Sequence, residues 1–81
     1  MSASMAEILE AGRQHAGLSI QQLWLAYYSL GGNATPLAFD GYLAGTELPV
    51  AREYDLIAQA LNDHFIDAGE NHPVPYAEDL T

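Results

Sequence analysis

Residues 35–65 read TPLAFDGYLAG (35–45), TELP (46–49) and VAREYDLIAQALNDHF (50–65). Thr35 is a favourable N-cap, and Pro36 stands at the first helical position, where its missing amide hydrogen costs nothing. Gly45 is a typical helix stop. The pattern predicts a short helix over residues 36–44. Gly41 in its interior costs on the order of 1 kcal/mol relative to alanine, and close approach of another helix would explain it.

A longer amphipathic helix is predicted to follow, beginning near Pro49 or Val50. Its apolar residues recur at three- and four-residue intervals and would face the core: Tyr54, Ile57, Leu61, Phe65 and Ala68. The opposite face is polar: Arg52, Asp55, Gln59, Asn62 and Asp63. We therefore expect a tight turn at residues 46–49 between the two helices, and we expect one side of the second helix to be buried.

Another helix is predicted near the N-terminus. Ser4 is followed three residues later by Glu7, which is the spacing of a capping box. The helix would run from about Met5 to His15, and Gly17 is positioned to end it.

A second capping box, formed by Ser19 and Gln22, starts the next predicted helix, and Gly31-Gly32 ends it. Leu25 and Tyr28 fall outside its main apolar stripe, which indicates either deep burial or an additional contact surface. Over the four helices the predicted core is Trp24, Tyr27, Phe39, Ile57, Leu61 and Phe65.

From Glu70 the sequence changes, because Pro73 and Pro75 exclude a helix across them. Val74 and Tyr76 could pack back on the helices, or the segment could be recognised by another protein. We expect an all-α protein: a small four-helix bundle in residues 1–69, followed by an extended, acidic, Pro-containing C-terminal tail in residues 70–81.

Charge is the most unusual global property. Eleven acidic residues face two arginines, with no lysine, for a net charge of −9. Nucleic acids and anionic membranes would repel such a chain at long range, whereas a protein with a basic surface would be attracted. The sequence has no cysteine, no apolar run long enough to span a bilayer and no secretory signal, so we expect a cytoplasmic protein.

The sequence contains no recognisable set of catalytic or cofactor-binding residues. We therefore expect that the protein is not an enzyme and binds no cofactor. The chain has neither a Gly-x-Ser-x-Gly elbow nor a phosphate-binding loop with its lysine. Asp63, His64 and Asp67 could combine with His72 as a metal site, since His64 and Asp67 lie at i and i+3 on one helix. The simpler interpretation is that the three histidines of the chain, these two and His15, are unrelated to one another. We therefore expect no bound metal.

The order of these elements resembles the λ-repressor-type (XRE-like) helix-turn-helix domain over about residues 5–66. The segments that resemble it are Gly17-Leu18-Ser19, Leu25-Ala26, Gly31, the 35–45 helix, Leu48-Pro49 and Ile57-Ala58-Gln59-Ala60-Leu61. The resemblance implies four helices in that order, with the third placed to enter the DNA major groove.

The third helix nevertheless lacks the side chains that read DNA. Its first turns contain apolar residues together with Asp40 and Gly41. None of these side chains has an amide or guanidinium group that could hydrogen-bond to a base edge. Only Asn33 and Thr35 could contact the phosphate backbone. No DNA-reading residue is therefore transferred from the family, and we expect no specific nucleic-acid binding.

The expected function is that of a small, acidic, regulatory protein–protein interaction module on a helix-turn-helix-like scaffold. Leu37 would be an apolar anchor ringed by Asp40, Glu47 and Glu53, unless its side chain packs inward. The partner would be a protein with a basic surface, and homodimerisation is also possible. Two alternatives remain: a dimeric DNA-binding transcriptional regulator that does not use the third helix, and a structural subunit of a larger complex.

Overall fold

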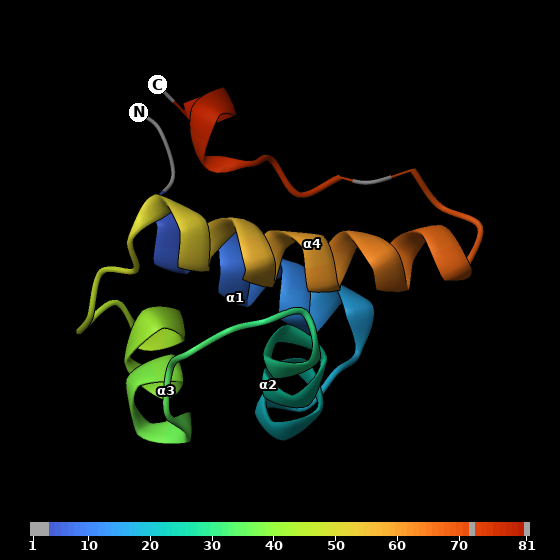
Figure 1. The fold of residues 1–81 in the computed structure, drawn as a ribbon. Helices are drawn as coiled ribbons and strands as arrows, with labels where there is room; N and C mark the ends of the chain where they lie inside the picture. The colour runs from blue at the N-terminus through green and yellow to red at the C-terminus, as the bar shows by residue number, and fades with distance from the viewer. Residues whose placement is uncertain (1–3, 72, 81) are drawn as a thin grey trace.

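The computed structural model describes residues 4–71 and 73–80. In these residues the chain forms four α-helices and one short 3-10 helix, and no strand (Figure 1). The helices are α1 (Met5–Ala16), α2 (Ile20–Ser29), α3 (Pro36–Ala44), α4 (Ala51–Asp67) and the 3-10 helix η1 (Ala77–Leu80). α4 packs against α1 and α2, and α3 packs against the same two helices. The all-α, four-helix prediction is confirmed.

The predicted helix starts are present. Both capping boxes form: Ser4 Oγ accepts from the Glu7 amide at 3.1 Å and Ser19 Oγ from the Gln22 amide at 3.0 Å. Thr35 Oγ1 accepts from the amide of Ala38 at 3.2 Å. Each such cap stabilises its helix by about 1 kcal/mol, which is why these local signals place the helices correctly.

The core is formed by buried side chains from all four helices. Five of the six predicted core residues are buried, whereas Trp24 is only half-buried. Tyr54, predicted to face the core from α4, is also fully buried, and so are Leu9 of α1 and Leu23 of α2. Ala68, expected on the inner face of α4, is exposed because it caps the helix end beyond the core.

Gly41 makes a close contact, but not with a helix. A Cβ at this position would lie 2.6 Å from Cγ of Glu47, in the loop that follows α3. The amides of Gly45, Thr46 and Glu47 all donate to the Gly41 carbonyl, at 2.9 to 3.2 Å. The expected helix approach was therefore wrong, and a tight loop folded back on α3 requires the glycine instead.

The C-terminal segment runs back along α4 in the opposite direction (Figure 1). Val74 is buried, and Asn62 of α4 hydrogen-bonds both of its backbone polar groups. Asn62 was expected on the polar outer face of α4, yet it is 1% exposed, because the tail covers it. Residues 73–76 are irregular, and Ala77–Leu80 then form η1. Among the helices described, none is long and apolar enough to cross a membrane.

Candidate interaction surface on α2 and α3

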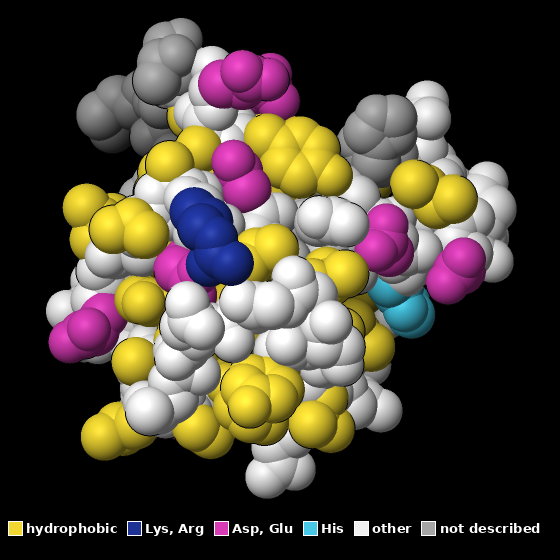
Figure 2. Space-filling view, in the orientation of Figure 1, with side chains coloured by type: hydrophobic (Ala, Val, Ile, Leu, Met, Phe, Trp, Pro, Cys, Tyr) yellow, Lys and Arg dark blue, Asp and Glu magenta, His cyan; other side chains and the backbone are white. Residues whose placement is uncertain are grey.

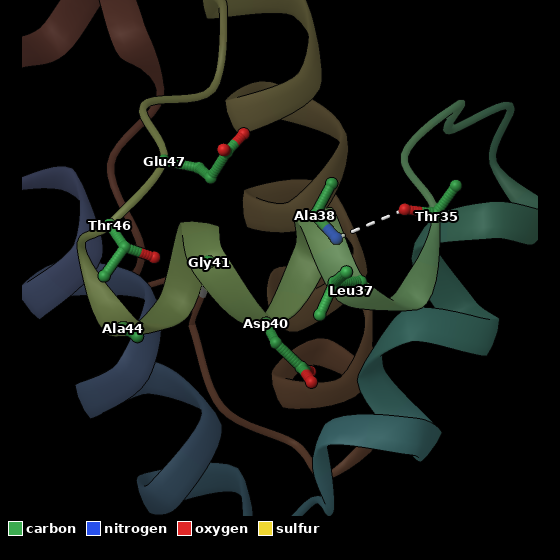
Figure 3. A pocket seen from close by; sticks show the side chains of 8 residues that line it. All are labelled: Thr35, Leu37, Ala38, Asp40, Gly41, Ala44, Thr46 and Glu47. Carbon is green, nitrogen blue, oxygen red and sulfur yellow. Dashed lines mark hydrogen bonds between the residues drawn. The ribbon is translucent and has the colours of Figure 1, made fainter.

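The outer side of α3 presents three of the four predicted site residues. Leu37 is 82% exposed, and Asp40 and Glu47 are also exposed. All three border one hollow of about 410 Å³, which we call the α3 hollow (Figure 3). Its lining is Thr35, Leu37, Ala38, Asp40, Gly41, Ala44, Thr46 and Glu47. Leu37 does not pack inward, and Leu37 and Asp40 project from the same side of α3 (Figure 3).

The core determines which side of α3 faces outward. Phe39 and Leu43, four residues apart, are buried against the other helices. At about 100° per residue, Leu37 must then point away from the core, and Asp40 lies on the flank of the buried face. The stem of Glu47 lies over Gly41, which holds its carboxylate at the other end of the hollow.

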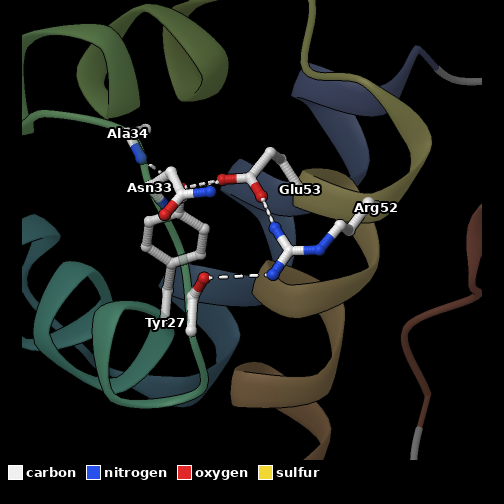
Figure 4. Close-up of polar contacts among 6 residues, drawn as sticks. Tyr27, Asn33, Ala34, Arg52 and Glu53 are labelled. Atoms are coloured by element: carbon white, nitrogen blue, oxygen red, sulfur yellow. Dashed lines mark hydrogen bonds and ion pairs between the residues drawn. The ribbon is translucent and has the colours of Figure 1, made fainter.

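Glu53, the fourth predicted residue, is placed elsewhere. It is 7% exposed, and its carboxylate accepts hydrogen bonds from the Tyr27 hydroxyl and from the Asn33 amide, the latter at 3.0 Å (Figure 4). Arg52 Nη1 contacts the second oxygen at 2.5 Å. Burial acts to raise the pKa of Glu53, but the bonds from Tyr27 and Asn33 and the charge of Arg52 outweigh it, so the pKa lies below its ordinary value. Glu53 is therefore not part of the exposed ring around Leu37.

This buried network fixes the loop between α2 and α3 (Figure 4). The Tyr27 hydroxyl accepts from the amide of Ala34 at 2.8 Å, and Arg52 Nη2 donates to the carbonyl of Gly31 at 3.2 Å. A Cβ on Gly32 would lie 2.2 Å from Tyr27 Cζ, so the loop crosses directly over the ring. Burial and the neighbouring Glu53 raise the pKa of Tyr27 to about 12. Glu53 thus acts by positioning α3 relative to α2.

A second hollow lies between α2 and α3, and sequence reasoning did not place it. This α2–α3 groove has a volume of about 380 Å³ and is lined by Ile20, Gln21, Trp24, Leu25, Pro36 and Asp40. Leu25 is 58% exposed, and Tyr28, three residues later on α2, is 57% exposed. Trp24 stacks on Tyr28 with ring centroids 5.0 Å apart, and its Nε1 donates to the carbonyl of Ala34 at 3.0 Å.

The position of Leu25 and Tyr28 outside the buried stripe of α2 was the sequence signal for an exposed apolar surface here, and Leu25 lines the groove. Leu23 and Tyr27, four residues apart, occupy the inner face. Leu25 is two positions from each of them and Tyr28 is one position after Tyr27, so at about 100° per residue both lie outside this inner face. The sequence left deep burial and an extra surface as alternatives, and the structure shows an exposed surface.

The two cations of the chain both make intramolecular contacts. Arg13 pairs with Glu10 at 2.6 Å and donates to the carbonyl of Leu18 at 2.8 Å. Arg52 pairs with Glu53. On the face shown in Figure 2, the basic side chain lies directly beside acidic ones, with apolar side chains spread around them. The remaining carboxylates dominate the electrostatic field of the surface.

Histidines and carboxylates do not gather into a metal site in the described part of the chain. Within residues 4–71 and 73–80 no group of three potential metal ligands is close enough to hold an ion. His72, the third member of the set considered from the sequence, lies outside the described residues.

The α3 hollow and the α2–α3 groove therefore lie next to each other, with Asp40 in the lining of both. No protein-family model, no curated protein and no solved structure was found to match the chain.

Proposed function

We propose that this protein is a small regulatory protein–protein interaction module, built on a helix-turn-helix-like scaffold, that binds a basic protein surface with α2 and α3. The observation that carries the proposal is the exposure of Leu37 on the outer side of α3, in the α3 hollow that Asp40 also borders. In a helix-turn-helix protein this side of the third helix would carry polar DNA contacts.

The composition of this surface is that of a protein interface. Apolar and aromatic residues form its centre: Ile20, Trp24, Leu25, Tyr28 and Leu37. Asp40 borders both hollows and so lies between Leu37 and the residues of the α2–α3 groove, whereas Glu47 lines the α3 hollow alone. An apolar centre with aromatic anchors and a polar rim is the usual arrangement of a binding hot spot.

Charge favours a protein over a nucleic acid as the partner. Phosphate binding draws its affinity from free Lys and Arg, and both arginines here contact acidic side chains of their own chain. A basic protein surface would instead be steered by the −9 field, so association should slow steeply as salt rises.

The test compares two variants of the surface with two matched controls in the full-length protein. Leu37→Ala and Asp40→Lys should each weaken the binding of a partner captured from lysate by about tenfold or more, as expected for hot-spot residues. Asp63→Lys makes the same charge change on the exposed side of α4, and Ile66→Ala truncates another exposed apolar side chain. Both controls should leave the dissociation constant unchanged.

Two results would contradict the proposal. One is an equal loss of binding in the control variants, which would place the surface elsewhere. The other is a sequence-dependent mobility shift with duplex DNA at low salt that weakens on substitution of Asn33 or Thr35, which would favour the DNA-binding alternative.

A further inference from the structure

Asp40 supplies the carboxylate of the α2–α3 groove, and its charge is not neutralised within the chain. In the described part of the chain its side chain makes no hydrogen bond and no ion pair. The side chain extends outward from α3 (Figure 3), and it lines the α3 hollow as well as the groove. Asp63 and Asp67 also lack a partner in the described residues, but they lie on α4 and do not line this groove. The Asp40 carboxylate is therefore free to pair with a cation of another molecule.

The rest of the groove is apolar and aromatic, apart from Gln21. Trp24 is its largest side chain, and the indole is held in place from two sides. Its Nε1 donates to the carbonyl of Ala34 at 3.0 Å, and the ring of Tyr28 stacks on it with centroids 5.0 Å apart. An occupant of the groove therefore meets a fixed aromatic ring and an unpaired carboxylate together.

A guanidinium group is the cation that suits this combination. It is planar, stacks on aromatic rings and can donate two parallel hydrogen bonds to one carboxylate. An ammonium group is more strongly hydrated and has no plane to stack, so a lysine would lose more hydration on entering an apolar groove. The methylene stem of an arginine would lie along the apolar lining supplied by Ile20 and Leu25.

The guanidinium must come from a different protein. Arg13 pairs with Glu10 at 2.6 Å, and Arg52 pairs with Glu53. A second copy of this chain could supply a guanidinium only by breaking one of these pairs, and it would bring a further net charge of −9. A partner with a basic surface is instead attracted by that charge.

We propose that the α2–α3 groove is an arginine-binding site, which takes one arginine side chain of the partner against the Trp24 indole and pairs its guanidinium with Asp40. The inference rests on the proposed function and names the residue type by which the basic partner is recognised there. It also goes further, because the charge of a basic surface could come from lysine and arginine equally, whereas this site distinguishes them.

The test titrates the full-length protein with three peptides that have blocked ends: GLRLG, GLKLG and GLQLG. Nuclear magnetic resonance would follow the indole Nε1 proton of Trp24 at fixed ionic strength. GLRLG should shift this signal and should bind about fivefold or more tightly than GLKLG, with GLQLG weakest. The first two peptides carry the same charge, so their difference isolates the guanidinium group. Equal affinities of these two, or no shift at about 10 mM GLRLG, would overturn the inference.

Variants of the carboxylate supply the second measurement. Asp40→Asn keeps the shape of the side chain and removes its charge, so it should weaken GLRLG binding about fivefold or more. Asp63→Asn makes the same change on the exposed side of α4 and should leave the affinity unaltered. Equal effects of the two substitutions would overturn the inference.

Two further results separate this inference from the proposed function. A shift of the Trp24 signal on dilution of the free protein would identify a second copy as the occupant and would overturn the arginine site. Partner binding that is insensitive to Leu37→Ala would contradict the proposed function, but it would leave a preference for GLRLG over GLKLG standing.

Discussion

Removing the hydroxyl of Tyr27 should destabilise the protein more than replacing any other single polar side-chain group by hydrogen. Tyr27→Phe deletes a hydrogen bond donated to the Glu53 carboxylate and one accepted from the amide of Ala34. The ring stays in place, so the core keeps its packing and the change isolates the polar network.

The magnitude follows from the two bonds. A hydrogen bond to a charged group contributes about 1.5–3 kcal/mol and a neutral one about 1 kcal/mol. Glu53 keeps its bonds from the Asn33 amide and from Arg52, which moderates the loss. We expect a net cost of about 2–3 kcal/mol, which for a domain of this size lowers the melting temperature by roughly 10–20 °C.

Thermal unfolding followed by circular dichroism would measure this effect. Tyr28→Phe is the matched control, since it removes the hydroxyl of an exposed tyrosine. A Tyr27→Phe protein that melts together with the Tyr28→Phe control would refute the reasoning and show that the network contributes nothing to stability. Substituting Glu53 by Gln in the Tyr27→Phe background should cost less than it does in the wild type, because the two residues share one network.

Two other predictions concern the stability of the core and its dependence on pH. Leu61→Ala should cost about 2–5 kcal/mol, since Leu61 is fully buried, and a urea titration that gives less than about 1 kcal/mol would mean that α4 is rotated from the orientation described. Burial raises the pKa of Tyr27 and of Tyr54 to about 12, above the value of about 10 of an unfolded chain. The unfolded state therefore releases protons first as pH rises, so the free energy of unfolding should decrease between pH values of about 10 and 12, and less so in Tyr27→Phe, as measured by urea unfolding at several alkaline pH values.

The helices could be predicted from the sequence because their signals are local. A capping box such as Ser19 with Gln22 involves four consecutive residues and needs no knowledge of the rest of the fold. Gly45 ends α3 with a φ of 86°, for the same local reason. The four-helix architecture follows from these boundaries together with the spacing of apolar residues.

The side chains that were misplaced depend on contacts distant in sequence. Asn62 is polar and lies among polar residues of α4, and only the returning tail, 12 residues later, buries it. Glu53 was expected at the surface because a carboxylate is costly to bury, but its three partners come from α2, the following loop and its neighbour Arg52. By contrast, Asp40 was predicted at the surface and is there, and of the two alternatives that the sequence left for Leu37, an exposed side chain and one packed inward, the structure shows the exposed one.

Trp24 gives the protein a built-in optical reporter. It is the only tryptophan of the chain, and its half-buried indole forms one wall of the α2–α3 groove. Indole emission moves to shorter wavelength when water leaves the ring, so the intrinsic fluorescence should change when an occupant enters this groove, with no label attached. The tail lies across α4 from α2 and α3 (Figure 1), so a binding protein that covered only that side of the molecule should leave the emission unaltered.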